Sequence, residues 1–253
     1  MNDRIDEYER TNRAFWDDDA DDYQAAHHDD ISDAAWGAYR IPESELQILG
    51  DLTGLDVLEL GCGGAQASLA LAGSAGASFG LDLSIGQLRH AAANVRAADR
   101  RMGLVCASAS AVPYRAESFD VVFCDHGAMG FCDPETTVPE AARVLRPGGF
   151  LAFSLSTLLH NTCFPPGDPD GTLTNTLQQP MFGARAFDWG DGTIDFQMLH
   201  SEWIALFRRH GLQVEDLREL RPPEEARTGY DGFADLDWAR RWPGEEIWKV
   251  RKR

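Results

Sequence analysis

Two acidic residues flank a glycine-rich turn, and their spacing suits the binding of an adenosine-containing ligand. The segment 57–65 reads Val-Leu-Glu-Leu-Gly-Cys-Gly-Gly-Ala, and Asp82 follows Gly61 twenty-one residues later. Gly61 and Gly63 leave the backbone bare, so a ligand can approach it closely. A carboxylate at the end of the next apolar run, where Asp82 lies, typically accepts hydrogen bonds from ribose hydroxyls. The alternative role for Asp82 is a helix cap, although Ser84 is an equally good cap nearby.

The residues around the turn discriminate among adenosine ligands. A dinucleotide fingerprint has glycine or alanine at the position that Gln66 occupies, and a P-loop has Lys followed by Ser or Thr after its glycines. Glu59 places a negative charge beside the turn, where it would repel a pyrophosphate but can accept a hydrogen bond from an ammonium group. The pattern therefore predicts S-adenosylmethionine, and a nicotinamide oxidoreductase is an alternative that the glycine spacing disfavours.

The elements around these residues alternate between strands and helices. Apolar runs predict strands at 55–60, 77–82, 103–106, 119–124, 149–155, 212–220 and 246–250, and helices at 65–73, 85–98, 135–145 and 201–210. This order is typical of a Rossmann-like α/β fold: a doubly wound, seven-stranded, mostly parallel sheet with helices on both faces. We expect a single domain over residues 46–253.

Two segments depart from this rhythm. Residues 157–199 are rich in proline and glycine and are too long for an ordinary loop, which predicts a substrate-side insertion after strand five. Residues 1–45 mix aromatic with acidic side chains, and Phe15, Trp16, Tyr23, Trp36 and Tyr39 recur at spacings that suit amphipathic helices. We therefore predict an N-terminal helical lid over residues 1–45.

The motifs resemble those of the class I S-adenosylmethionine-dependent methyltransferases that act on small molecules. Glu59, Gly61 and Gly63 match the first motif of this family, with Ala65 in place of its last glycine, and four further motifs follow in the family's order. The resemblance covers roughly residues 50–156. It implies transfer of a methyl group to oxygen, nitrogen or carbon of a small metabolite by in-line displacement, which requires positioning more than covalent chemistry.

The resemblance also implies roles for individual residues. Glu59 and the backbone of residues 61–63 would hold the methionine end of the cofactor, Asp82 the ribose, and Leu83 and Gln87 would flank the adenine. The predicted cofactor-binding residues are Tyr23, His27, Glu59, Gly61, Cys62, Gly63, Gln66, Asp82, Leu83, Gln87, Ser108, Ala109 and Asp125.

Three of these positions carry alternatives. Ser108 stands where many relatives have an aspartate that accepts a hydrogen bond from the adenine amino group, so adenine recognition would depend on backbone and shape. Tyr23 and His27, with His28 beside them, match lid positions that often cover the methionine moiety. Their alternative is a helix-packing face.

His126 is the candidate catalytic residue. It lies in Cys-Asp-His-Gly-Ala at 124–128, after the fourth strand, at the sheet edge where α/β folds bind ligands. An imidazole titrates near neutrality and can take a proton from a hydroxyl, although His126 could equally orient the loop through a buried hydrogen bond. His160 and His200 are further candidates for the pocket rim. The aromatic residues of the 220–244 segment, Tyr230, Phe233, Trp238 and Trp242, either cap the sheet edge or line a substrate pocket.

The charge, the apolar runs and the cysteines of the sequence limit which ligands and partners we expect. The 253 residues carry a formal charge of −18 and no basic stripe, which disfavours nucleic acids. No apolar run approaches the roughly 20 residues that span a bilayer. The five cysteines occur singly, without the paired spacing of zinc sites, so we expect reduced thiols, no metal and a cytoplasmic location. The acceptor, the methylated atom and the oligomeric state are not indicated.

A protein of another class would carry the same motifs. If S-adenosylmethionine were bound only for regulation, or for chemistry other than methyl transfer, Glu59 and Asp82 would still be required. Turnover separates this alternative from a methyltransferase, because both proteins bind the cofactor and only one transfers its methyl group.

Overall fold

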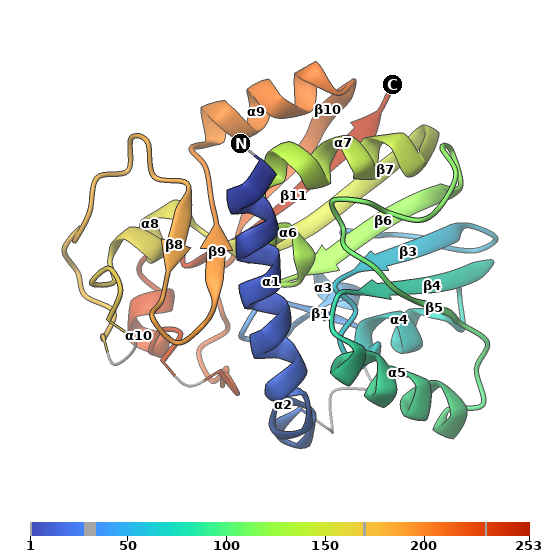
Figure 1. Cartoon of the computed structure of the whole chain (residues 1–253), viewed down its shortest axis with the longest axis horizontal. Helices are drawn as coiled ribbons and strands as arrows, with labels where there is room; N and C mark the ends of the chain where they lie inside the picture. Colours follow the sequence, from blue (N-terminus) through green and yellow to red (C-terminus); the bar gives the residue numbers. More distant parts are fainter. Residues whose placement is uncertain (1, 28–33, 169–170, 231) are drawn as a thin grey trace.

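The centre of the computed structural model, which describes residues 2–27, 34–168, 171–230 and 232–253, is a seven-stranded sheet. Its strands lie in the order β10-β11-β7-β6-β3-β4-β5 (Figure 1). In chain order the strands are β3 (Asp56–Leu60), β4 (Ala77–Asp82), β5 (Gly103–Cys106), β6 (Phe119–Asp125), β7 (Leu145–Ser156), β10 (Leu212–Glu219) and β11 (Glu245–Lys252). Each predicted strand is therefore present.

Most of the sheet is parallel. β3 pairs in parallel with β4 and β6, β6 pairs in parallel with β7, and β4 pairs in parallel with β5. β11 runs antiparallel to both β7 and β10. The predicted mostly parallel Rossmann-like sheet is confirmed, and its parallel strands present their carboxyl ends at one edge.

Helices cover both faces because the central strands are apolar on both sides. In β3, Leu58 packs with the residues of α7 (Pro134–Val144) and α9 (His200–Arg209), whereas Val57 packs on the opposite side with segment 36–52. The helices α4 (Gln66–Leu71) and α5 (Ile85–Ala97) follow β3 and β4, as predicted.

Capping residues mark the helix ends. The Ser84 hydroxyl accepts from Gln87 N at the start of α5, and Asp133 accepts from Glu135 N at the start of α7. The C-terminal cap of α9 is followed by Gly211, whose φ of +72° suits glycine. These caps explain why the predicted bounds of the three helices agree closely with the structure.

The N-terminal region is helical only in part. Helices α1 (Asn2–Asp18) and α2 (Ala20–Ala26) lie across the carboxyl edge of the sheet, with the insertion on the far side of α1 (Figure 1). A hairpin of β1 (Ala35–Trp36) and β2 (Ile41–Pro42) and the short α3 (Glu43–Leu46) come next.

The prediction that Trp36 and Tyr39 belong to helices is therefore wrong. Gly37 has a φ of +75°, which turns the chain between the two short strands. Trp36 is buried, and its indole donates to Glu43 at 2.7 Å. Aromatic and acidic residues alternated at helical spacing here, but a turn residue determined the structure.

The segment 157–199 has secondary structure of its own. It contains α8 (Leu158–Thr162) and a hairpin of β8 (Ala186–Asp188) and β9 (Ile194–Phe196), and it forms the left side of Figure 1. A short helix, α10 (Leu236–Ala239), lies between β10 and β11 in the chain. These elements build one side of the site described next.

Candidate cofactor and acceptor site

A cavity of about 270 Å³ lies at the carboxyl edge of the sheet. Its walls come from α1 and α2, the glycine turn after β3, the loop after β6, the β8–β9 hairpin and the 220–244 segment. Nine predicted residues line it: Tyr23, Gly61, Gly63, Asp82, Leu83, Gln87, Ala109, Asp125 and His126.

A smaller cavity of about 90 Å³ lies on the other side of the glycine turn and accounts for most of the remaining predictions. His27, Glu59, Cys62 and Gln66 line it. Ser108 lines neither of these two cavities, because its hydroxyl donates to Glu9 at 2.9 Å and lies 2.7 Å from the Ser110 hydroxyl. His28 is outside the described residues.

The glycine turn needs its glycines for two reasons. Gly61 has a φ of +72°, and a Cβ there would lie 2.4 Å from the backbone nitrogen of Ala128. The backbone nitrogens of Gly61 and Cys62 both donate to Leu81 O, at 2.8 and 3.0 Å. The turn is thereby held against the end of β4, and its bare backbone faces the cavity.

Asp82 braces the turn and also faces the cavity. Its Oδ2 accepts from Gly63 N and its Oδ1 from Ser84 N, each at 2.8 Å. Burial raises the pKa of Asp82, and these backbone hydrogen bonds oppose the shift. Since Ser84 caps α5 itself, capping does not require Asp82. A carboxylate has about four acceptor positions, so capacity for ribose hydroxyls remains.

Glu59 is a buried acid whose described hydrogen-bond partner is Ser68. Its Oε2 accepts from Ser68 N at 3.2 Å and is also bonded to the Ser68 hydroxyl. Burial raises the pKa of Glu59 to about 8, and the Ser68 bonds oppose the shift. Near neutral pH the group therefore holds a proton, and a cation placed beside it would favour the ionised form.

Three glutamine side chains connect α2 to the helices that follow the sheet strands. Gln66 Nε2 donates to Gln24 Oε1 at 2.6 Å, and Gln24 Nε2 donates to Gln87 Oε1 at 2.7 Å. Gln87 lines the larger cavity, and its Nε2 is buried without a partner among the residues that the structure describes. An unpaired buried donor costs about 1–3 kcal/mol. The chain of glutamines thus ends in a donor that suits a ligand acceptor.

An aromatic stack continues from α2 to the 220–244 segment. The His27 ring stacks on Tyr23 at 4.2 Å between centroids, and the Tyr23 hydroxyl lies 2.8 Å from the Tyr230 hydroxyl. Among the described residues, His27 Nε2 is buried without a hydrogen-bond partner. Tyr23 and His27 therefore pack against the 220–244 segment and also line the cavities, and their contact with the methionine moiety stays a prediction.

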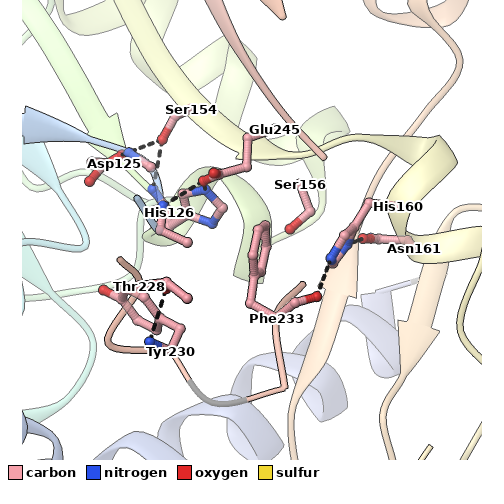
Figure 2. Close-up of polar contacts among 12 residues, drawn as sticks. Asp125, His126, Ser154, Ser156, His160, Asn161, Thr228, Tyr230, Phe233 and Glu245 are labelled. Atoms are coloured by element: carbon pink, nitrogen blue, oxygen red, sulfur yellow. Dashed lines mark hydrogen bonds and ion pairs between the residues drawn. The ribbon is translucent and has the colours of Figure 1, made fainter. Parts of the chain in front are cut away.

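His126 is held tightly at the end of β6. Its Nε2 lies 2.6 Å from Glu245 Oε1, and its backbone nitrogen donates to the Ser154 hydroxyl at 3.1 Å (Figure 2). The residue has a φ of +46°, a strained conformation of the kind that concentrates at functional sites. Asp125 Oδ1 accepts from the same Ser154 hydroxyl and from Gly37 N, at 2.5 and 2.8 Å.

The ion pair changes what His126 can do. Burial lowers the pKa of His126, but the hydrogen bond and charge of Glu245, with Asp125 and Asp195, outweigh this and raise it to about 9. The side chain is therefore an imidazolium near neutral pH. An imidazolium is a donor and holds its proton, so this geometry suits the orienting alternative better than a general base.

Neither of the other two histidines lines the cavities described above. His160 is buried, with Nε2 2.8 Å from Phe233 O, and His200 pairs with Glu246 at 2.7 Å. The aromatic residues of the 220–244 segment differ in their surroundings. Tyr230 and Phe233 line the larger cavity, whereas Trp238 is buried and Trp242 is 43% exposed.

Sequence reasoning missed Asp195. This residue of β9 lines the larger cavity together with Trp16, Phe131 and Ser156. Asp195 belongs to no motif, and the length of the 157–199 insertion was the one available signal.

Other predictions concern the cysteines, metal sites and membrane-spanning helices. The cysteines are free thiols, four of them buried and Cys106 exposed. Among the described residues, no group of three or more His, Cys, Asp or Glu side chains is arranged to hold a metal ion. Within the same residues, no helix is long and apolar enough to cross a membrane.

A doubly wound sheet with a bare glycine turn after its first strand and a cavity-facing acid after its second fits the predicted resemblance to the class I S-adenosylmethionine-dependent methyltransferases. Residues 58–153 match the family model described as a methyltransferase domain. This central part of the chain is therefore similar to a methyltransferase domain.

Curated relatives share this central part. A demethylmenaquinone methyltransferase of Lactococcus lactis subsp. lactis (strain IL1403) is 38% identical over 105 residues, covering 40% of this chain and 42% of the relative. A ubiquinone biosynthesis O-methyltransferase of Thiobacillus denitrificans (strain ATCC 25259 / T1) is 35% identical over 105 residues, covering 41% and 45%. The match thus spans less than half the length of each relative.

Solved structures share the fold over more of the chain. An S-adenosylmethionine-dependent methyltransferase from Mesorhizobium loti superposes with a TM-score of 0.64 at 21% identity, covering 83% of this chain and 96% of the other. The [4+2]-cyclase SpnF superposes with a TM-score of 0.65 at 19% identity, covering 95% and 94%. At these identities the likeness concerns the fold.

Proposed function

We propose that the protein transfers the methyl group of S-adenosylmethionine to oxygen, nitrogen or carbon of a small molecule. The observation that carries the proposal is that one cavity joins two kinds of wall. The glycine turn and Asp82 form one end, and His126, Asp195 and several aromatic side chains form the other. Cofactor and acceptor can thus be held together in one cavity.

The residues at the first end fit S-adenosylmethionine. Asp82 offers acceptors to the ribose hydroxyls, and the unpartnered Gln87 Nε2 offers a donor. Glu59 and the backbone of Gly61 and Gly63 line the space beyond the turn, where the amino group of the methionine moiety would favour the ionised form of Glu59.

Positioning and exclusion of water are the main tasks of the chain. When bound, the cofactor supplies a methyl group on a positively charged sulfur. Trp16, Tyr23, Phe131 and Tyr230 line the cavity and would exclude water from the line of attack. The His126 imidazolium would donate a hydrogen bond to the acceptor or to a neighbouring carboxylate, and so would orient it.

The acceptor is proposed to be modest in size and partly apolar. The aromatic wall supports this, as do the names of the demethylmenaquinone and ubiquinone biosynthesis methyltransferases that resemble the central domain. In the same proposal, residues 1–45 act as a lid over the 46–253 domain, insertion 157–199 forms the substrate side, and the protein works in the cytoplasm without a nucleic-acid partner.

Two measurements test the proposal. Isothermal titration calorimetry should show binding of both S-adenosylmethionine and S-adenosylhomocysteine. Incubation with methyl-labelled S-adenosylmethionine and a small-molecule extract should then label a low-molecular-weight product. Binding of both ligands without transfer to any fraction would favour the regulatory or non-transfer alternative, and failure to bind either would reject the cofactor assignment.

A further inference from the structure

We propose that Asp195 is the proton acceptor for methyl transfer to a hydroxyl group carried on an aromatic ring. The inference rests on the proposed methyl transfer, and it assigns a catalytic residue from the insertion and a class of acceptor. Asp195 lies outside the 58–153 region that matches the family model.

The hairpin that carries Asp195 is anchored beside the cavity. Within β9, Ile194 and Phe196 are buried, and the side chain of Asp195 between them lines the cavity. Ile194 N donates to Asn12 Oδ1 at 2.8 Å, and Asn12 Nδ2 donates to Ile194 O at 2.9 Å. This two-bond contact with α1 holds the backbone next to Asp195, as a catalytic side chain requires.

A tryptophan lies beside the carboxylate. The Trp189 side chain acts as a hydrogen-bond donor that lowers the pKa of Asp195. Its ring is itself held, stacked on Phe187 at 6.1 Å and edge-on to Phe164 at 5.4 Å between centroids. One donor leaves further acceptor positions on the carboxylate, so the arrangement orients a base without saturating it.

The electrostatic setting suits a proton acceptor that works near neutral pH. Burial raises the pKa of Asp195 to about 6, and the Trp189 hydrogen bond and the charge of His126 oppose the shift. A base is most effective when its pKa lies near the working pH. Asp195 is ionised at pH 7 and basic enough to take a proton, whereas His126 already carries one.

Charged groups on several elements share the cavity or the hairpin with this carboxylate. They are Arg13 on α1, Asp82 after β4, Asp125 and His126 after β6, and Asp191 in the hairpin turn, and the charges of His126 and Asp191 shift the pKa of Asp195. The other titratable groups on the wall are Tyr23, Cys132 and Tyr230.

The wall around Asp195 and His126 favours a ring-bearing acceptor. Trp16, Phe131, Tyr230 and Phe233 line the same cavity, and flat apolar rings pack well against such side chains. A hydroxyl on that ring would be the polar group that meets the carboxylate.

The step balances without a further reagent. The acceptor oxygen forms a bond to the methyl carbon while the carbon–sulfur bond breaks and its electron pair remains on sulfur. The hydroxyl proton passes to Asp195. The products are a methyl ether, S-adenosylhomocysteine and a protonated Asp195, which returns its proton to solvent.

The test uses the whole protein with methyl-labelled S-adenosylmethionine and three phenols as probes: catechol, 4-nitrophenol and 1-naphthol. Transfer by the wild type should fall as the pH drops through about 6. Asp195→Asn should lower kcat by about 100-fold or more and abolish that acid limb, which matches the usual contribution of general base catalysis. Asp195→Glu should recover part of the rate with a displaced limb.

Matched controls separate chemistry from folding. Asp188→Asn in the same hairpin keeps an exposed acceptor oxygen for Gly190 N and should leave rate and pH profile unchanged. S-adenosylhomocysteine should bind Asp195→Asn with wild-type affinity.

Three outcomes would overturn the inference. These are a wild-type rate and acid limb in Asp195→Asn, transfer to aniline but to none of the phenols, or transfer to an extract component alone. Absence of transfer to any compound by the wild type would instead reject the proposed function itself.

Discussion

The two ends of the cavity are built in different ways. The glycine-turn end uses backbone nitrogens and carboxylates that lie close together in the chain, between Glu59 and Gln87. The opposite end uses side chains that the fold gathers from distant segments, such as Trp16, Asp195 and Phe233. The first end depends on local backbone geometry, and the second depends on tertiary packing, so the second can change with little effect on the first.

The buried acid beside the glycine turn and the buried acid beside His126 differ in their partners. Glu59 has the Ser68 backbone and hydroxyl as its described hydrogen-bond partners, and burial raises its pKa to about 8. Glu245, which lies behind the cavity wall, pairs with His126 at 2.6 Å and also accepts from Ala38 N at 2.6 Å. Glu59 therefore lacks a cationic partner among the described residues, whereas Glu245 is paired with the His126 imidazolium.

The largest effect should come from the glycine turn. Gly61→Ala places a Cβ 2.4 Å from Ala128 N at a φ of +72°. Strain and overpacking together should cost about 3 kcal/mol or more of unfolding free energy. Chemical denaturation and calorimetry with S-adenosylhomocysteine measure the loss. Gly130→Ala, where a Cβ meets no atom within 4 Å, is the matched control. Equal stability of both variants would contradict the geometry.

The second largest effect should come from Asp82, and it should appear in ligand affinity. Asp82→Ala should weaken S-adenosylhomocysteine binding by about 1–3 kcal/mol, because hydrogen bonds to a charged acceptor are lost. Ser84→Ala removes the true cap of α5 and should lower stability by about 1 kcal/mol with a smaller change in affinity. Unchanged affinity in Asp82→Ala would remove this residue from the site.

The pH dependence of binding should report on Glu59. Its pKa of about 8 in the free protein should fall when an ammonium group binds, so binding releases a proton below pH 8. Affinity for S-adenosylmethionine should therefore rise by up to about tenfold per pH unit between pH 6 and 8. Glu59→Gln should flatten this slope, and a flat profile in the wild type would place the amino group elsewhere.

The smallest effect should come from the glutamine chain. Gln24→Ala removes one donor and one acceptor that join α2 to Gln66 and Gln87. We expect cofactor affinity to fall by about 1 kcal/mol, the net value of a typical hydrogen bond. Gln213→Ala, far from both cavities on β10, serves as the control in the same titration. Equal cofactor affinity in the Gln24→Ala and Gln213→Ala variants would show that α2 does not contribute to cofactor binding.

The local end of the cavity was predictable from the sequence because its geometry arises within short stretches. An apolar strand, a glycine turn and a following acid determine where Gly61 and Asp82 lie. Ser108 shows where inference from a family motif fails, because its hydroxyl donates to Glu9 of α1 and does not line either cavity.

The packed end was predictable only in part: His126, Tyr230 and Phe233 were candidates, but their partners and Asp195 were not. The sequence shows that His126 can titrate, but its proton is held by Glu245, which is 119 residues away in the chain. Asp195 reaches the cavity through contacts between Asn12 and Ile194, which are 182 residues apart. No local pattern encodes such pairings.

The glutamine chain has one further consequence. Because Gln24 joins α2 to the helices on both sides of the turn, we expect ligand occupancy and the order of the N-terminal helices to be thermodynamically linked. Resistance of α2 to limited proteolysis should then rise with ligand concentration. An unchanged cleavage rate would contradict this thermodynamic linkage. Ligand binding and protection of the chain from proteolysis would then be two readouts of one equilibrium.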